Sequence, residues 1–223
     1  MFADRTDAGR QLAESLAGRA YPGGLVLAIP RGGVVVGAEI ARALQLPLDI
    51  IIPRKIGAPH NPELAIGAVT QDGTAIFNEA LLAQFYLSPE EREHLISTAV
   101  AEIDRRMRLY RGDRPPVSWR DRTVILTDDG IATGFTVVAA LRSLQKAGPR
   151  KIILAVPVAP PDTLERLRSE VDELVCLLAP EFFMAVGQFY RHFDQTTDAE
   201  VIALLKELGP DGADGSAVTT FPA

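Results

Sequence analysis

The hydrophobic positions of this chain fall into short apolar runs that alternate with amphipathic segments. The runs are rich in β-branched residues, are bounded by turn-forming residues, and cover residues 24–30, 48–53, 123–128, 151–158 and 172–179. They are apolar on both faces, which is typical of strands in a covered parallel sheet. Helical patterns lie between them, at residues 34–45, 135–147 and 161–170, and another covers residues 1–18. Alternating strands and helices predict an α/β fold with a doubly wound, mainly parallel sheet of about five core strands.

One stretch between the second and third runs breaks this alternation. Residues 66–77 have the pattern of a hairpin whose turn lies at Asp72-Gly73. A long helix is predicted over residues 89–111, where Ser88 and Glu91 have the spacing of a capping box. We therefore expect one domain over residues 1–208. The hairpin and helix would be an insertion at about 66–118, and residues 209–223 would be a flexible tail.

Composition excludes several classes of protein. Apolar residues make up 47% and charged residues 23% of the 223 residues, which is ordinary for a globular protein. The single Cys176 lies in an apolar run, where a small core residue is expected rather than a nucleophile, and no disulfide can form within the chain. No run approaches the roughly 18 apolar residues that span a membrane, and no signal peptide is recognisable. These features predict a cytoplasmic protein without a membrane partner.

The charge distribution bears on nucleic-acid binding. The net charge is −6, so nucleic acid is not an expected partner of the molecule as a whole. The segment DRRMRLYRGDR at residues 104–114 holds five arginines, which leaves open a regulatory protein that binds RNA or DNA. Acidic residues interrupt this segment, and its arginines would point away from the apolar face of the helix. A solvated helix face is the simpler interpretation.

The segment RTVILTDDGIATGFT at residues 122–136 carries the strongest chemical signal. Asp128 and Asp129 follow a buried strand, and ligands of open parallel sheets bind beyond the carboxyl ends of the strands. Residues 132–136 then offer small side chains and two threonine hydroxyls at the start of a helix, whose unpaired amides can bind an anion. The segment therefore predicts a phosphate site beside two carboxylates, which suits a phosphorylated sugar. The alternative is an Asp-Gly turn before a helix capped by threonine.

This segment resembles the 5-phosphoribosyl-1-pyrophosphate (PRPP) binding motif of type I phosphoribosyltransferases. The family pattern is an apolar strand, two acids, two variable residues, a small residue, Thr-Gly and a final Thr. Two positions depart from it, Gly130 where an aliphatic residue is usual and Phe135 where a small residue is common. The resemblance implies that Asp128 and Asp129 bind the ribose hydroxyls and a Mg²⁺ ion. It also implies that PRPP contacts the loop formed by Ala132, Thr133, Gly134, Phe135 and Thr136.

The segment AIPRGGVVVGAEIARAL at residues 28–44 is similar to the loop that holds pyrophosphate in this family. The resemblance implies that Arg31, Gly32 and Gly33 bind PRPP. It also implies a cis peptide bond between Pro30 and Arg31. A plain glycine turn is the alternative.

The segment PRKIGAPHNPELAIGAV at residues 53–69 is similar to the mobile hood loop of the family. The resemblance implies that Arg54 and Lys55 reach pyrophosphate. The prolines and glycine predict an irregular segment from Lys55 to about Ala65 that closes as a lid. A basic surface loop is the alternative. With all three segments in the family's order, the chain looks most like the uncharacterised predicted phosphoribosyltransferase branch.

The resemblance implies transfer of the phosphoribosyl group from PRPP to an unidentified acceptor, expected to be a nitrogenous base, with release of pyrophosphate and dependence on Mg²⁺. Asp129 and Lys55 are the expected catalytic residues. Ala132 stands where enzymes for 6-oxopurines commonly have an aspartate, which weakens that choice of acceptor.

The aromatic segment at residues 179–193 offers Phe183 as an acceptor contact, although packing against the core is the alternative for these rings. A homodimer is expected. A PRPP-binding regulator without essential transferase activity, and an unrelated phosphate-binding α/β protein, are the other interpretations.

Overall fold

A computed structural model describes residues 1–59, 61–112, 114 and 117–210, and its centre is one parallel sheet. The strands are β1 (Leu25–Ala28), β2 (Leu48–Ile50), β6 (Thr123–Thr127), β7 (Lys151–Val158) and β8 (Glu173–Leu178). Their order is β2-β1-β6-β7-β8, and all four pairings are parallel. This confirms the predicted sheet. Because β2 lies on one side of β1 and β6 on the other, the order reverses between β1 and β6.

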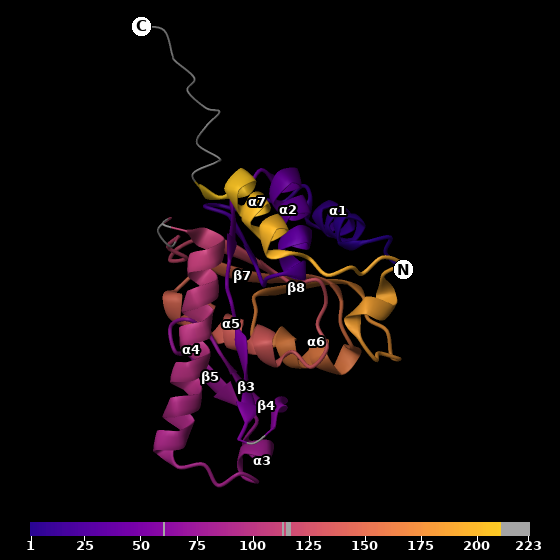
Figure 1. Cartoon of the computed structure of the whole chain (residues 1–223). Helices are drawn as coiled ribbons and strands as arrows, with labels where there is room; N and C mark the ends of the chain where they lie inside the picture. Colours follow the sequence, from indigo (N-terminus) through magenta and orange to yellow (C-terminus); the bar gives the residue numbers. More distant parts are fainter. Residues whose placement is uncertain (60, 113, 115–116, 211–223) are drawn as a thin grey trace, which may run out of the picture.

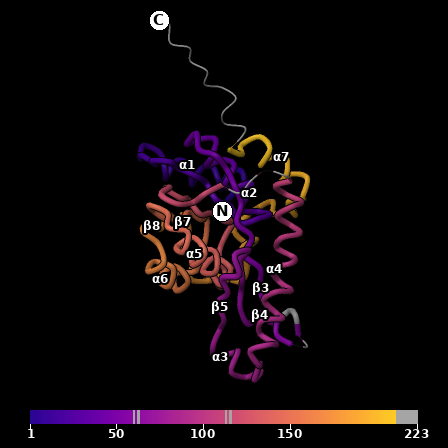
Figure 2. The backbone as a smooth tube through the Cα atoms, turned by 90° about the vertical axis from the view of Figure 1, so that its left-hand side faces the viewer, coloured from indigo at the N-terminus to yellow at the C-terminus, as the bar shows by residue number. Residues whose placement is uncertain are grey.

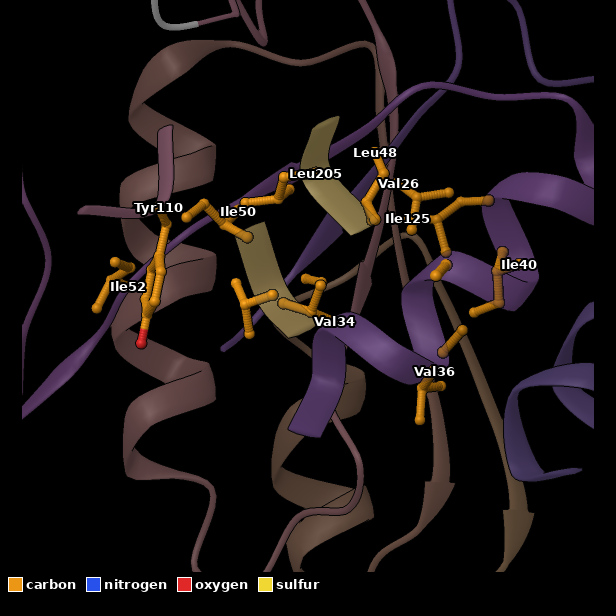
Figure 3. Packing of buried hydrophobic residues seen from close by; sticks show 14 of the residues in the cluster. Val26, Val34, Val36, Ile40, Leu48, Ile50, Ile52, Tyr110, Ile125 and Leu205 are labelled. Carbon is orange, nitrogen blue, oxygen red and sulfur yellow. The ribbon is translucent and has the colours of Figure 1, made fainter. Parts of the chain in front are cut away.

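Helices cover both faces of this sheet (Figure 1). One face carries α1 (Arg5–Leu16), α2 (Gly32–Leu44) and α7 (Asp198–Leu208), and the other carries α5 (Phe135–Ala147) and α6 (Pro161–Arg168). Successive strand residues point to opposite faces, so Val26 and Leu27 enter different hydrophobic clusters. Figure 3 shows the first cluster, where Val26 and Leu48 of the sheet lie near Ile40 of α2. The doubly wound arrangement is therefore as predicted.

The insertion is a small antiparallel sheet with a long helix beside it (Figure 2). Its strands, in the order β3-β4-β5, are β3 (Arg54–Ala58), β4 (Asn61–Val69) and β5 (Ala75–Phe77). A short α3 (Glu79–Leu82) leads to α4 (Pro89–Arg111), which contacts β3. The turn at Gly73, with φ of 75°, and the capping box of Ser88 and Glu91 are both as predicted.

The expectation of an irregular segment from Lys55 to about Ala65 is wrong. Lys55 lies opposite Ala68 in the β3–β4 ladder, and the register shifts on either side of Gly57. A glycine accommodates such a bulge easily because it has no side chain. Among the described residues, the first half of β4, up to Ala65, has β3 as its one partner strand, so a proline in this half removes no hydrogen bond to a second strand. The antiparallel sheet therefore begins at Arg54, and we call residues 54–77 the hood.

Two predicted segments extend beyond the residues that the structure describes. His60 of the predicted hood loop lies outside the described residues, as do residues 211–223 of the predicted tail. Among the helices that the structure describes, none is both long enough and apolar enough to cross a membrane.

Candidate active site

The two adjacent acids lie where the sheet order reverses. Asp128 and Asp129 directly follow β6, next to the end of β1 and the turn that begins α2. That turn packs against them without any space: a Cβ on Gly33 would lie 2.8 Å from the Cα of Asp128, and one on Gly32 would overlap Oδ2 of Asp129. Only glycine permits this approach. The structure thus brings the predicted pyrophosphate loop and the acidic pair together, and the Pro30–Arg31 peptide bond is cis, as the resemblance implied.

The acidic pair is more enclosed than an exposed strand end. The Asp129 amide donates to Oδ1 of Asp128 over 2.8 Å, and its own Oδ2 accepts from Nε of Arg5 over 2.7 Å. The pKa of Asp128 is raised well above its ordinary value, mainly by burial and secondly by the negative charge of Asp129. Burial also raises the pKa of Asp129, and the hydrogen bond and positive charge of Arg5 oppose this rise. Arg5 is therefore part of the electrostatic environment of the site.

The start of α5 has the geometry of an anion site. Its N-cap, Gly134, has φ of 75°, a left-handed conformation that glycine adopts readily. The carbonyls of Ala132 and Thr133 turn toward α6, where they accept hydrogen bonds from Thr163 (2.9 Å) and Arg166 (3.1 Å). In the part of the chain that the structure describes, no hydrogen-bond acceptor is recorded for the backbone amides of residues 132–136. These amides form the positive end of the α5 dipole.

Two of the three predicted basic side chains, those of Arg31 and Arg54, pair with acidic residues outside the site. Nη1 of Arg31 lies 3.6 Å from Oδ1 of Asp198, the first residue of α7. Nη1 of Arg54 lies 3.8 Å from Oε1 of Glu102 on α4. Lys55 is exposed and lines a cavity of about 600 Å³ along β3 and α4. Among the described residues, no recorded hydrogen bond or ion pair joins these three side chains to the acidic pair.

Two residues that the sequence did not single out contact Asp129. Arg5 binds its carboxylate, and the Tyr190 hydroxyl donates to its carbonyl over 2.6 Å. Residues 2–5 lie beside residues 189–194, and we call these two segments the bracket. Backbone hydrogen bonds hold them together, from the Phe2 amide to the Phe189 carbonyl (2.8 Å) and from the Arg191 amide to the Phe2 carbonyl (2.9 Å).

Comparison with known proteins assigns a family to this arrangement. Residues 7–194 match the phosphoribosyl transferase domain. The chain belongs to this family. It is 41% identical over 218 residues to the Mycobacterium tuberculosis proteins Rv0571c and MT0597, both provisionally named phosphoribosyl transferases. The match covers 98% of this chain and 49% of each relative, so the chain spans about half of their length. The crystal structure of TT1426 from Thermus thermophilus aligns with a TM-score of 0.80 at 41% identity, over 93% of this chain and 99% of that one.

The structure gives a local cause for one departure from the family pattern, Gly130, and shows the surroundings of the other, Phe135. A Cβ on Gly130 would lie 2.6 Å from Cγ1 of Val186 and 3.0 Å from Cγ1 of Val158, so an aliphatic residue does not fit there. Phe135 lines a cavity of about 510 Å³ between α5 and β5, together with Phe77. Its ring therefore faces the hood side of α5.

The predicted acceptor contact, Phe183, is half-buried. Its ring centroid lies 5.1 Å from that of Phe189, in a cluster that includes Tyr190. Phe182 next to it is 88% exposed. Residues 179–193 form a loop with a short 3-10 turn, η1 (Val186–Phe189), so most of these rings serve packing, and the assignment of Phe183 to an acceptor stays a prediction.

The carboxylates also fit a particular type of metal site. Within the described ranges, no group of three or more histidine, cysteine, aspartate or glutamate side chains could hold a metal ion. Mg²⁺ is usually bound by one or two carboxylates together with substrate phosphates and water. Asp128 and Asp129 therefore fit a Mg²⁺ ion that arrives with a phosphorylated substrate.

Proposed function

We propose that this chain transfers the 5-phosphoribosyl group of PRPP to a nitrogenous base and releases pyrophosphate. One observation carries the proposal: the acidic pair, the glycine turn of α2 and the open amides before α5 meet at one reversal of the sheet order. A ligand with a phosphate, two ribose hydroxyls and a pyrophosphate needs three such features side by side. Membership of the phosphoribosyl transferase family supports the same chemistry.

Each part of the site takes one part of PRPP in this proposal. The amides of residues 132–136 bind the 5-phosphate, and Asp128 and Asp129 accept hydrogen bonds from the ribose hydroxyls. The turn at residues 31–33 faces the pyrophosphate. Positive charge develops on the ribose ring as pyrophosphate leaves, as in glycoside hydrolysis, and the two carboxylates stabilise it. A Mg²⁺ ion bound with PRPP would neutralise charge on the leaving pyrophosphate.

Arg54 and Lys55 reach pyrophosphate only after the hood moves. The long contact between Arg54 and Glu102 is 3.8 Å, and the two side chains are 41% and 26% exposed. Exposed ion pairs contribute little to stability because solvent screens them, so breaking this one costs little. Lys55 would then act on the departing pyrophosphate, where negative charge accumulates in the transition state.

The test of PRPP binding is calorimetry with PRPP and Mg²⁺. A lost hydrogen bond to a charged group costs about 1.5–3 kcal/mol, so Asp129→Asn should weaken binding by at least about tenfold. Asp104→Asn on α4 removes the same charge from an exposed position and should leave binding unchanged. Equal affinities for the wild type and Asp129→Asn would exclude the ribose-binding role.

Transfer itself is tested by release of pyrophosphate from PRPP and Mg²⁺ in the presence of nucleobases, amines and small heterocycles. Stimulation by one acceptor supports the transferase. PRPP binding without stimulation by any of them favours the PRPP-binding regulator instead.

The arginines of α4 give little support to a nucleic-acid surface. Arg105 and Arg106 both bind Glu102, and Arg111 binds the buried Asp49. These three arginines are therefore engaged in ion pairs within the protein, although only two carboxylates serve them.

A further inference from the structure

The geometry points to Arg5 as a positioning residue for Asp129. This inference rests on the proposed role of Asp129 in PRPP binding. It assigns the first helix of the chain to the active site, although the motifs that identify the site begin after β1.

The Arg5 guanidinium is held on three sides. Nε donates to Oδ2 of Asp129 over 2.7 Å, and Nη1 donates to the carbonyl of Asp194 over 2.6 Å. The guanidinium carbon lies 3.8 Å from the ring centroid of Phe193. Since the side chain is only 12% exposed, it offers little surface to a ligand. Arg5 therefore acts through Asp129 rather than by touching substrate.

Other contacts hold the backbone of Asp129 and close one side of its carboxylate, which leaves Arg5 as the hydrogen-bond donor to the carboxylate among the described residues. Tyr190 binds its carbonyl, Asp128 accepts from its amide, and the α2 turn closes against its carboxylate at Gly32. A Cβ on Gly32 would also lie 2.6 Å from Nε of Arg5, so this glycine makes room for the ion pair. Without Arg5, the Asp129 carboxylate would keep its negative neighbour Asp128 and lose its only recorded cation among the described residues. It would then leave the orientation that accepts the ribose hydroxyls.

Calorimetry with PRPP and Mg²⁺ tests this inference on variants of the whole chain. Arg5→Ala should weaken PRPP binding by about tenfold, as expected for the loss of a hydrogen-bonded partner of a ligand-binding carboxylate. Arg5→Lys should not restore binding, because one ammonium group cannot bind Asp129 and Asp194 together as the guanidinium fork does. Arg10→Ala is the matched control, since Arg10 lies on the same helix, is 68% exposed and pairs with Glu39. Thermal unfolding of each variant checks that it is folded.

A double-mutant cycle separates positioning from direct contact. In an Asp129→Asn background, Arg5→Ala should change PRPP affinity by less than about twofold, because a residue that acts through Asp129 has nothing left to position. A tenfold loss in both backgrounds would mean that Arg5 meets the ligand itself, and would overturn the inference. Full binding by Arg5→Ala or by Arg5→Lys would overturn it too. If Arg5→Ala does not fold, Arg5→Lys completes the same cycle.

The outcomes distinguish this inference from the proposed function. A wild type that binds no PRPP overturns both. A wild type that binds PRPP and is sensitive to Asp129→Asn, with Arg5→Ala equal to the wild type, overturns the role of Arg5 alone.

Discussion

At the scale of single residues, the fold disfavours the ionised form of the Asp128 carboxyl group. Burial and the neighbouring Asp129 raise the pKa of Asp128, so folding makes this carboxyl harder to ionise. Proteins commonly retain such destabilising groups where a ligand uses them. The acidic pair should therefore cost stability in the free protein and contribute affinity when a ligand binds.

Asp128→Asn is expected to stabilise the ligand-free protein at pH 8. The folded pKa of Asp128 lies above its unfolded pKa, so the folded state binds more protons between these two values. Stability contributed by this group is therefore full below the unfolded pKa and falls as the pH rises through that window. Asparagine removes the ionisation, and a gain of about 1 kcal/mol would raise Tm by about 2–4 °C in a chain of this size.

Scanning calorimetry at pH 8 and pH 4 measures this effect, and the gain should shrink at pH 4. PRPP affinity should fall in the same variant. An equal loss of Tm at both pH values would contradict the prediction, since it would mean that the Asp128 carboxylate makes interactions that asparagine cannot replace.

At the scale of elements, the sequence predicts the core well and the hood poorly. β1, β2 and β6 are buried along their whole length and β7 is buried after its first residue, so their apolar runs are continuous and easy to recognise. β3, with the sequence RKIGA, has two basic residues and a glycine, and its pairing with β4 tolerates a register shift. Its strand structure depends on packing beside α4, which local sequence does not record.

The hood should show graded hydrogen exchange. Amides in the ladder between Lys55–Ile56 and Gly67–Ala68 should be protected in the free protein, because they lie in a paired sheet. Amides nearer the β3–β4 turn should exchange faster, and should gain protection with PRPP and Mg²⁺ if the hood closes over pyrophosphate. Hydrogen exchange with mass spectrometry, with and without PRPP, measures both parts. Rapid exchange along the entire hood would contradict this prediction and would support the irregular lid that the sequence predicts.

A buried ion pair fastens α4 to the core. Nη2 of Arg111 donates to both carboxylate oxygens of Asp49 in β2, over 2.9 and 2.8 Å, and the side chains are 11% and 6% exposed. Arg111→Ala leaves a buried carboxylate without its partner and should lower the free energy of unfolding by about 3–5 kcal/mol. Arg105→Ala on the same helix, at an exposed pair, should lower it far less, because solvent screens that pair. Urea denaturation compares the two, and similar losses would mean that Asp49 finds other partners.

At the scale of the whole molecule, the sequence predicts which motifs meet and misses what surrounds them. The acidic pair and the glycine turn follow neighbouring parallel strands, so their meeting follows from the sheet order. Arg5 and Tyr190 reach Asp129 only because distant segments come together in the bracket, and nothing in an amphipathic helix distinguishes Arg5 from Arg10. The partners of Arg31 and Arg54 come from α7 and α4, whose positions the sequence pattern does not give.

The bracket also implies an order of events during folding. The hydrogen bond from Arg5 to Asp194 joins residues 189 positions apart, nearly the length of the domain. Bringing such distant residues together costs the entropy of closing a long loop. We therefore expect these contacts to form after the sheet. In stopped-flow refolding, far-ultraviolet circular dichroism should recover before the ability to bind PRPP, and the lag should be independent of protein concentration. If the circular dichroism signal and PRPP binding recover together, the bracket forms together with the sheet, which would contradict this order. A late bracket would mean that the chain passes through a compact form with its motifs in place and its acidic pair still without a cation.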